Sequence, residues 1–293
     1  MVDAVHGTIG AQQRSDIGIV TLADSRYLPG LKLLCQSVQE SCDVPVACFD
    51  LGLTPEEIEQ ARTKCSNLSI LPLPDTADMA AVRRAFAGAG PLAKPGKRVW
   101  PIWACPFLIA ASPFQRVFWV DSDIVVLRNL RDLFSLLDDG PVFTPENFAP
   151  QVTPNKPMLY KLLPIARTFN PLEPRINAGV SGWDLSRESD RAALDAYMTA
   201  VRAACADHRV AESISGWDQG ALIWAIQRCG LEHRVSIPGR GTCASSTPAP
   251  FGIVMAGMTE RLNVCVLMFP KPIYCIGMGM RHRGLLTHEM GCQ

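Results

Sequence analysis

Short apolar runs alternate with helical periodicities along the first third of the chain. Runs at residues 17–21, 45–49 and 68–73 have the composition of buried strands. The apolar positions between the first two runs recur with helical spacing over 28–40. The segment 54–64 begins with Thr-Pro-Glu-Glu, in which threonine is an N-cap and the acidic residues meet the positive end of a helix. This order of strand, helix and strand predicts a doubly wound sheet.

A longer apolar run follows and is interrupted only by two carboxylates. An apolar helix expected at 101–111 leads into the run 116–127, which contains Asp121 and Asp123 one residue apart. The run predicts a strand buried on both faces of a sheet, and α/β proteins place their chemistry at the end of such a strand. Because a buried carboxylate pair is costly unless it is neutralised, and because divalent cations prefer oxygen ligands, the pair predicts a metal site.

The pattern changes in the second half of the chain. Residues 141–174 carry many prolines and few periodic segments, which favours an active-site wall or an acceptor loop. Helical patterns return at 187–206 and 218–228. Residues 238–293 are irregular again, with one strand expected at 263–269.

Composition excludes several classes of protein. A chain of 293 residues that is 48% hydrophobic and 19% charged predicts a globular domain of enzyme size. Lysine plus arginine and aspartate plus glutamate number 28 each, so no basic field indicates nucleic acid as a partner. No apolar stretch approaches the roughly 20 residues of a transmembrane segment.

The eleven cysteines have no metal-ligand or redox spacing, since no Cys-x-x-Cys occurs. Their number is odd, and the start of the sequence lacks a basic region followed by an apolar core. These features predict reduced cysteines in a cytoplasmic protein, with peripheral contact at the inner membrane left open.

Four segments carry a family resemblance. They are Ile-Val-Thr21-Leu-Ala-Asp24-Ser-Arg-Tyr27, Val-Phe-Trp-Val-Asp121-Ser-Asp123, Ile-Asn177-Ala-Gly179-Val-Ser-Gly-Trp183 and Gly216-Trp217-Asp218-Gln219-Gly220. In this order they resemble the GT-A nucleotide-sugar glycosyltransferases, and especially glycosyltransferase family 8, the glycogenin-like retaining enzymes. The flanks Ser112-Pro-Phe114 and Asp132-Leu-Phe134 are also similar to fungal α-mannosyltransferases of the same fold.

The resemblance implies an α/β fold of the GT-A type, a single Rossmann-like doubly wound mixed sheet flanked by helices. We expect residues 1–15 to form a flexible N-terminus and residues 16–293 to form one glycosyltransferase domain. Its nucleotide-binding half would be 16–135. Its half for acceptor and donor sugar would be 136–293, with a C-terminal loop.

The resemblance also implies roles for individual residues. Asp121 and Asp123 would hold Mn2+ or Mg2+, with Asp121 and its neighbour Ser122 close to the nucleotide. Tyr27 would stack on uracil beside the backbone of Thr21, Leu22 and Ala23. Asn177, Asp218 and Gln219 would form the catalytic group that binds donor-sugar hydroxyls. A structural alternative stands beside each role: a strand-end turn for the aspartates, packing for Tyr27, a turn for Asn177 and a helix cap for Asp218.

The sequence departs from the family at two places. Met268 stands where the family's C-terminal metal ligand, a histidine, is expected, so His282 is our candidate third metal ligand. Lys271 would contribute to a basic cluster for the diphosphate, together with Arg281 and Arg283. Such enzymes also often carry a lysine on the helix before the acidic strand; Cys105 lies there in this chain, with Lys97 and Arg98 as alternatives.

These features predict a metal-dependent glycosyltransferase. It would move a hexose from a nucleotide sugar, a UDP-hexose, to a hydroxyl of a saccharide, a lipid-linked acceptor or a protein, with retention. Two alternatives stay open. Asp121-Ser-Asp123-Ile-Val125 also satisfies the pattern of haloacid-dehalogenase-type phosphohydrolases, although these carry it on their first strand. The other alternative is a non-catalytic protein that binds sugar nucleotides or glycans.

Overall fold

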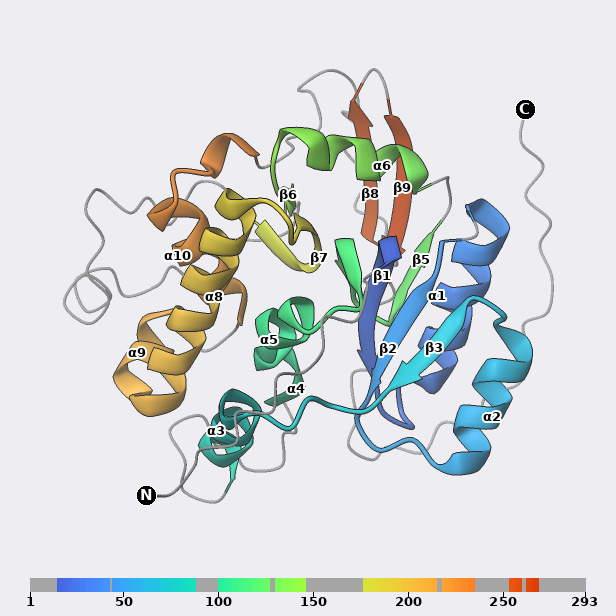
Figure 1. Ribbon diagram of the computed structural model, residues 1–293, viewed down its shortest axis with the longest axis horizontal. Coiled ribbons are helices and arrows are strands. Elements are labelled where there is room, and N and C mark those ends of the chain that lie inside the picture. The colour runs from blue at the N-terminus through green and yellow to red at the C-terminus, as the bar shows by residue number, and fades with distance from the viewer. Residues whose placement is uncertain are drawn as a thin grey trace, which may run out of the picture.

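A six-stranded mixed sheet with strand order β3-β2-β1-β4-β7-β6 forms the centre of the protein (Figure 1). The computed structural model describes residues 15–42, 44–87, 100–126, 130–145, 176–214, 218–234, 253–259 and 262–268. The strands of this sheet are β1 (Ser15–Ala23), β2 (Val46–Asp50), β3 (Leu68–Leu71), β4 (Phe114–Val120), β6 (Val142–Pro145) and β7 (Ile176–Asp184).

The sheet has a parallel and an antiparallel part. β1 pairs in parallel with β2 on one side and with β4 on the other, so that Ile19 lies between Val46 and Phe118. β2 pairs in parallel with β3, whereas β7 is antiparallel to both β4 and β6. The predicted α/β class, with a doubly wound mixed sheet, is therefore confirmed.

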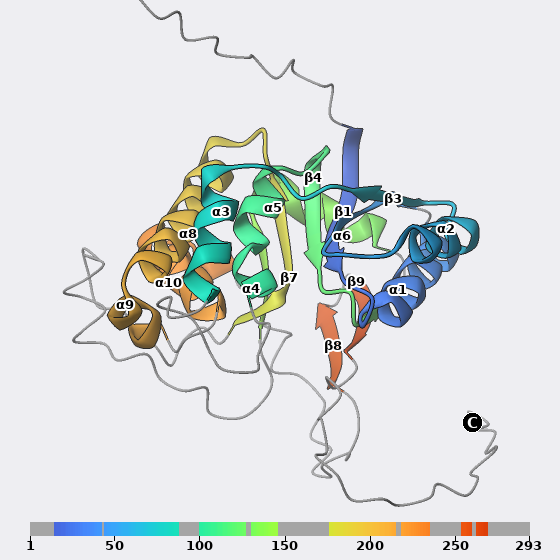
Figure 2. The same cartoon turned by 90° about the horizontal axis from the view of Figure 1, so that it is seen from below.

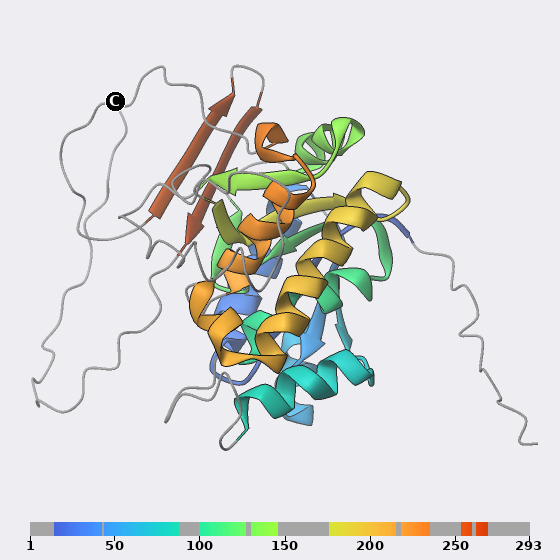
Figure 3. The same cartoon turned by 90° about the vertical axis from the view of Figure 1, so that its left-hand side faces the viewer.

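Helices cover both faces of this sheet (Figure 2). One layer contains α1 (Leu28–Ser41) and α2 (Pro55–Lys64), which pack on one hydrophobic cluster. The other layer contains α3 (Ala77–Phe86), α5 (Cys105–Ala110), α8 (Glu188–Ala206) and α10 (Asp218–Arg228), which share a second cluster. Figure 3 shows α8 and α10, in yellow and orange, crossing in front of the sheet. Because strand side chains alternate between faces, Ile19 belongs to the first cluster and Val20 to the second.

The remaining helices are short. They are α4 (Trp100–Trp103), α6 (Arg131–Leu136), α9 (His208–Ser213) and the 3-10 turns η1 (Leu137–Asp139) and η2 (Glu232–Arg234). No helix in the described ranges is long and apolar enough to cross a membrane. The cysteines described as free thiols are Cys35, Cys42, Cys48, Cys65, Cys105, Cys205 and Cys229.

The acidic strand is the main correction to the sequence prediction. Instead of one strand over 116–127, β4 ends at Val120 and β5 (Ile124–Val126) begins after Asp123, in a second sheet. This sheet has the order β5-β9-β8, with β8 (Ile253–Thr259) and β9 (Leu262–Met268). The Ile124 amide donates to the Asp121 carbonyl, which closes a turn that an apolar pattern does not reveal.

The helix predicted over 101–111 is also interrupted. It is divided at Ala104 into α4 and α5, and Pro106 lies in the first turn of α5. Proline has no amide hydrogen to bond the carbonyl of Ile102 four residues earlier, so one continuous helix is disfavoured. The helices expected near 28–40, 54–64, 187–206 and 218–228 are confirmed, as is the strand near 263–269.

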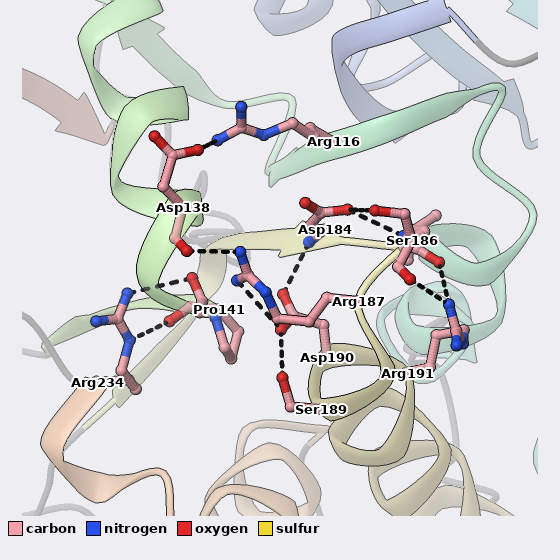
Figure 4. Close-up of polar contacts among 12 residues, drawn as sticks. Arg116, Asp138, Pro141, Asp184, Ser186, Arg187, Ser189, Asp190, Arg191 and Arg234 are labelled. Atoms are coloured by element: carbon pink, nitrogen blue, oxygen red, sulfur yellow. Dashed lines mark hydrogen bonds and ion pairs between the residues drawn. The ribbon is translucent and has the colours of Figure 1, made fainter.

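Arginine side chains tie the segment after β5 to the rest of the molecule (Figure 4). Arg116 of β4 donates to the Phe134 carbonyl and to the Asp138 carboxylate, the latter at 2.7 Å. Arg187 donates to the Asp138 carbonyl at 2.8 Å. Arg234 of η2 donates to three further carbonyls of this segment, those of Leu136, Gly140 and Pro141. α6 and η1 are thereby held against β4, α8 and η2, on the side of the sheet where β6 pairs with β7.

Thr54→Ala should lower the free energy of unfolding by about 1 kcal/mol, because the variant loses an N-cap. The Thr54 hydroxyl accepts from the Glu57 amide while the Glu57 carboxylate accepts from the Thr54 amide, so α2 has a complete capping box. Thr63→Ala, at an exposed position in the last turn of the same helix, is the control and should not destabilise. Equal losses for both variants in urea unfolding would contradict the capping role.

Candidate active site

The candidate site lies at the switch point of the sheet, between β1 and β4. β1 and β4 are parallel neighbours, and the chain runs from β1 outward to β2 and β3 on one side but from β4 to β7 on the other. In open α/β sheets, ligands bind at the carboxyl ends of the strands at such a switch point. The turn after β1 and the Asp121–Asp123 turn after β4 both lie at this edge.

These two turns are in close contact. A Cβ built on Gly30, in the first turn of α1, would lie 2.6 Å from the Ser122 backbone oxygen and 3.4 Å from the Asp123 Cα atom. Only glycine permits this approach. The start of α1 therefore packs directly on the backbone of the acidic turn.

The turn after β1 contains the residues predicted to contact the base. Thr21 is fully buried, and its hydroxyl has no hydrogen-bond partner among the described residues. Ala23 is buried, Leu22 is partly buried, and both lie in the last residues of β1. The side chains of Thr21 and Ala23 are therefore inaccessible to a ligand at this edge. Tyr27 is partly buried and packs against the α1 side of the core, so packing accounts for part of its ring surface.

β7 and Trp119 hold Asp121 from two sides. The Asp121 amide donates to the Gly179 carbonyl at 2.8 Å, and the Trp119 indole N–H donates to Asp121 Oδ1 at 3.2 Å. A Cβ on Gly179 would lie 2.7 Å from Asp121 Oδ2 and 2.8 Å from Asn177 Oδ1. The predicted residues Asp121 and Asn177 therefore lie close together, beside the backbone of Gly179.

Asp218 and Gln219 begin α10, and both are partly buried. The Tyr197 hydroxyl, from α8, donates to Asp218 Oδ2 at 3.3 Å. Burial raises the pKa of the Cys105 thiol well above its ordinary value, and the nearby carboxylates of Asp218 and Asp121 raise it further. Helix α10 packs on β7, the strand whose Gly179 carbonyl accepts from the Asp121 amide, so β7 lies between α10 and the acidic turn.

Two predicted residues, Lys271 and His282, lie outside the described residues, as do Lys97 and Arg98. The backbone of Met268, at the end of β9, pairs with Ile124 directly after the acidic turn. Within the described part of the chain, no three His, Cys, Asp or Glu side chains are grouped so that they could hold a metal. The roles of Asp121 and Asp123 as metal ligands therefore stay a prediction.

Sequence reasoning missed two side chains that contact predicted site residues. Trp119 shares the face of Asp121 because it is two residues earlier in the same extended segment, so strand periodicity could have identified it. Tyr197 contacts Asp218 only because α8 packs on α10. No local signal in the sequence marks that contact.

No family model and no curated protein matches this chain. Among solved structures it is similar to the bifunctional glycosyltransferase WbbM in its apo form, with 14% identity, 81% of this chain and 40% of that chain covered, and a TM-score of 0.48. It is similar to the galactosyltransferase LgtC in complex with donor and acceptor sugar analogues, with 20% identity, 57% and 58% covered, and a TM-score of 0.41.

Core-mannan synthase A from Aspergillus fumigatus, in a Mn/GDP form, is a third similar structure, with 13% identity, 77% of this chain and 72% of that chain covered, and a TM-score of 0.49. The chain spans less than two thirds of the length of WbbM and of LgtC. The function proposed below therefore rests on the residues of the site and on their sequence motifs.

Gly30→Ala should lower the free energy of unfolding by about 1–3 kcal/mol, because the new Cβ meets the backbone of Ser122. The sign of this change in unfolding free energy is informative. Without the contact, alanine would stabilise the helix by about 1 kcal/mol relative to glycine. Glu40→Ala, at an exposed position of α1, is the control and should change the value by less than about 0.5 kcal/mol. A Gly30→Ala variant as stable as the parent in urea would mean that the acidic turn moves away freely.

Proposed function

We propose that this protein transfers a hexose from a nucleotide sugar, a UDP-hexose, to a hydroxyl group of a saccharide, a lipid-linked acceptor or a protein. One observation carries the proposal: Asp121 and Asn177 lie together at the switch point of the sheet, near the turn after β1, and α10 packs on β7. These are the four segments whose motifs resemble nucleotide-sugar glycosyltransferases. Retention of the anomeric configuration is proposed from that resemblance.

The nucleotide would bind at the carboxyl end of β1. The backbone of Thr21, Leu22 and Ala23 would meet the base edge, and the exposed part of the Tyr27 ring would lie against the base. Ser122 is largely buried, and its backbone contacts the start of α1. The acidic turn therefore packs on the helix that follows the proposed base site. A shift of α1 would displace both.

Asp121 and Asp123 fit a divalent cation, Mn2+ or Mg2+, by the chemistry of their oxygen atoms. When bound, such a cation would neutralise the charge that develops on the departing diphosphate. Trp119 orients one oxygen of Asp121, and the missing side chain of Gly179 leaves room for the other. His282 as a third ligand and Lys271 as a diphosphate contact complete the proposal from residues outside the described ranges.

The donor sugar would lie between Asn177, Asp218 and Gln219. The side-chain oxygen Oδ1 of Asn177 accepts from the Gly179 backbone amide at 2.7 Å, which directs the rest of the side-chain amide group. The Asp218 carboxylate accepts a hydrogen bond from the buried Tyr197 hydroxyl, which orients the carboxylate. Carboxylate and amide groups fixed in this way can discriminate sugar hydroxyls by direction.

The alternative activities are less well supported. Three strands, β1 to β3, precede the aspartate pair, whereas haloacid-dehalogenase-type phosphohydrolases carry it on the first strand. A non-catalytic sugar-nucleotide binder would have the same site, and assays separate it from an enzyme. Cation-dependent transfer from, or hydrolysis of, a nucleotide sugar by the purified protein would support a transferase, and binding without turnover would support the binder.

Asp123→Asn should lower turnover of the nucleotide sugar at least ~100-fold, because the variant loses a charged cation ligand at the leaving group. Removal of the cation with EDTA should abolish the parent activity, and Mn2+ should restore it. Asp139→Asn, at an exposed carboxylate of η1, is the matched control and should keep full turnover. Undiminished transfer by Asp123→Asn in EDTA would contradict the metal site.

Gly179→Ala should weaken Mn2+ and UDP binding on the order of tenfold, because its Cβ would displace Asp121, which supports the metal site. Gly182→Ala on the same strand is the control, since its Cβ would meet the Phe118 ring in the core at 2.6 Å. Both variants should lose stability, but only Gly179→Ala should lose affinity in calorimetric titrations. Equal affinity losses would show that β7 acts only through general stability.

A further inference from the structure

Tyr197 is a buried polar group with a partner in the candidate site. It lies near the middle of α8 and is fully inaccessible to solvent. Its hydroxyl donates to Asp218 Oδ2 at 3.3 Å. Burying a phenol is costly unless its hydroxyl finds a partner, and here that partner is a carboxylate at the first residue of α10.

The packing of α8 restricts the Tyr197 ring. Small buried residues surround its position on the helix, namely Ala193, Ala200 and Ala204, and they allow α8 to approach its neighbours closely. A fully buried ring in a closely packed interior keeps one orientation. The hydroxyl is therefore held at a defined position next to the Asp218 carboxylate.

The Tyr197 hydroxyl is a constant donor. Burial raises the pKa of Tyr197 well above its ordinary value, and the neighbouring Cys105 and Asp218 raise it further. The Cys105 thiol beside it also stays protonated. Because neither group titrates in the ordinary pH range, a role in proton transfer is disfavoured, and orientation is the role that the contact can serve.

We infer that Tyr197 is a positioning residue for the donor sugar: its hydroxyl fixes the direction of the Asp218 carboxylate, and through it the choice between hexoses that differ in one hydroxyl. The inference rests on the proposed function. A carboxylate with a fixed direction favours the epimer whose hydroxyl it meets, whereas a rotating one accepts either. Tyr197 acts on the sugar only through Asp218, so binding of the nucleotide alone should not depend on it.

The test is Tyr197→Phe, which removes the hydroxyl and keeps the ring. For the preferred UDP-hexose, kcat/KM should fall on the order of tenfold, and the preference over its epimer should narrow by a similar factor. UDP affinity with Mn2+ should stay within about twofold of the parent value, since the interaction lost is not one with the nucleotide. Trp183→Phe is the matched control. It removes another buried aromatic donor, the indole that bonds the Ser181 hydroxyl at 2.9 Å, and should leave the preference intact.

A second measurement tests the contact without any activity. In a double-mutant cycle of Tyr197→Phe and Asp218→Ala, the two changes in the free energy of unfolding should be non-additive if the hydrogen bond forms in solution. Additive changes would overturn the inference. If Tyr197→Phe does not fold, fluorinated tyrosines at position 197 vary the donor strength of the same hydroxyl, and kcat/KM for the preferred donor should vary across the series.

The outcomes distinguish this inference from the proposed function. Absence of cation-dependent turnover with every nucleotide sugar would contradict the proposed function and this inference with it. An active parent with an unchanged donor preference in Tyr197→Phe would overturn the inference alone. Parallel loss of UDP affinity and turnover, or the same narrowing in Trp183→Phe, would also overturn it, because either would indicate a general structural effect.

Discussion

The pairing of β4 on both of its edges determines where the candidate site of this protein lies. β4 is parallel to β1 and antiparallel to β7, so its end is aligned with the end of β1 while Gly179 of β7 comes alongside it. The last of these contacts is the hydrogen bond from the Asp121 amide to the Gly179 carbonyl. If β4 lost either partner, Asp121 would no longer lie beside both the turn after β1 and Asn177.

Two glycines let the backbone of one segment approach a neighbouring segment more closely than a side chain would allow. Gly30 lets α1 contact the acidic turn, and Gly179 lets β7 contact the Asp121 carboxylate. Neither has a positive φ, so the requirement is for space and not for an unusual backbone conformation. Such a site has little freedom to rearrange, because each added methyl group would meet backbone or the Asp121 carboxylate.

Local signals predicted much of the fold. The Thr54 capping box and the apolar runs of β1 and β2 depend on residues close together in the sequence, and these elements form where expected. The end of β4 at Val120 was not predicted, because apolar residues continue beyond the acidic turn into β5 of another sheet. β7 was identified only as a motif around Asn177, since its glycines and polar residues obscure a strand pattern.

The same distinction applies to the site. Asp121, Asn177 and Asp218 were predicted from motifs, and the contact between Asp121 and Asn177 follows from a strand pairing that no motif encodes. Trp119 follows from the two-residue period of a strand once Asp121 is known. Tyr197 depends on helix packing between segments about twenty residues apart, which sequence periodicity describes only as an apolar face.

The groups that orient the site carboxylates have a chemical property in common. Trp119 is always neutral, and burial keeps Tyr197 protonated, so these two donors bring no positive charge to Asp121 or Asp218. Burial also keeps the nearby Cys105 thiol protonated. A lysine at the position of Cys105 would orient a carboxylate and also cancel its charge, whereas a neutral donor only orients it. The proposed cation and the donor-sugar hydroxyls would then meet carboxylates whose direction is set by buried aromatic donors. Because these donors are neutral, the carboxylates keep the negative charge that attracts a cation.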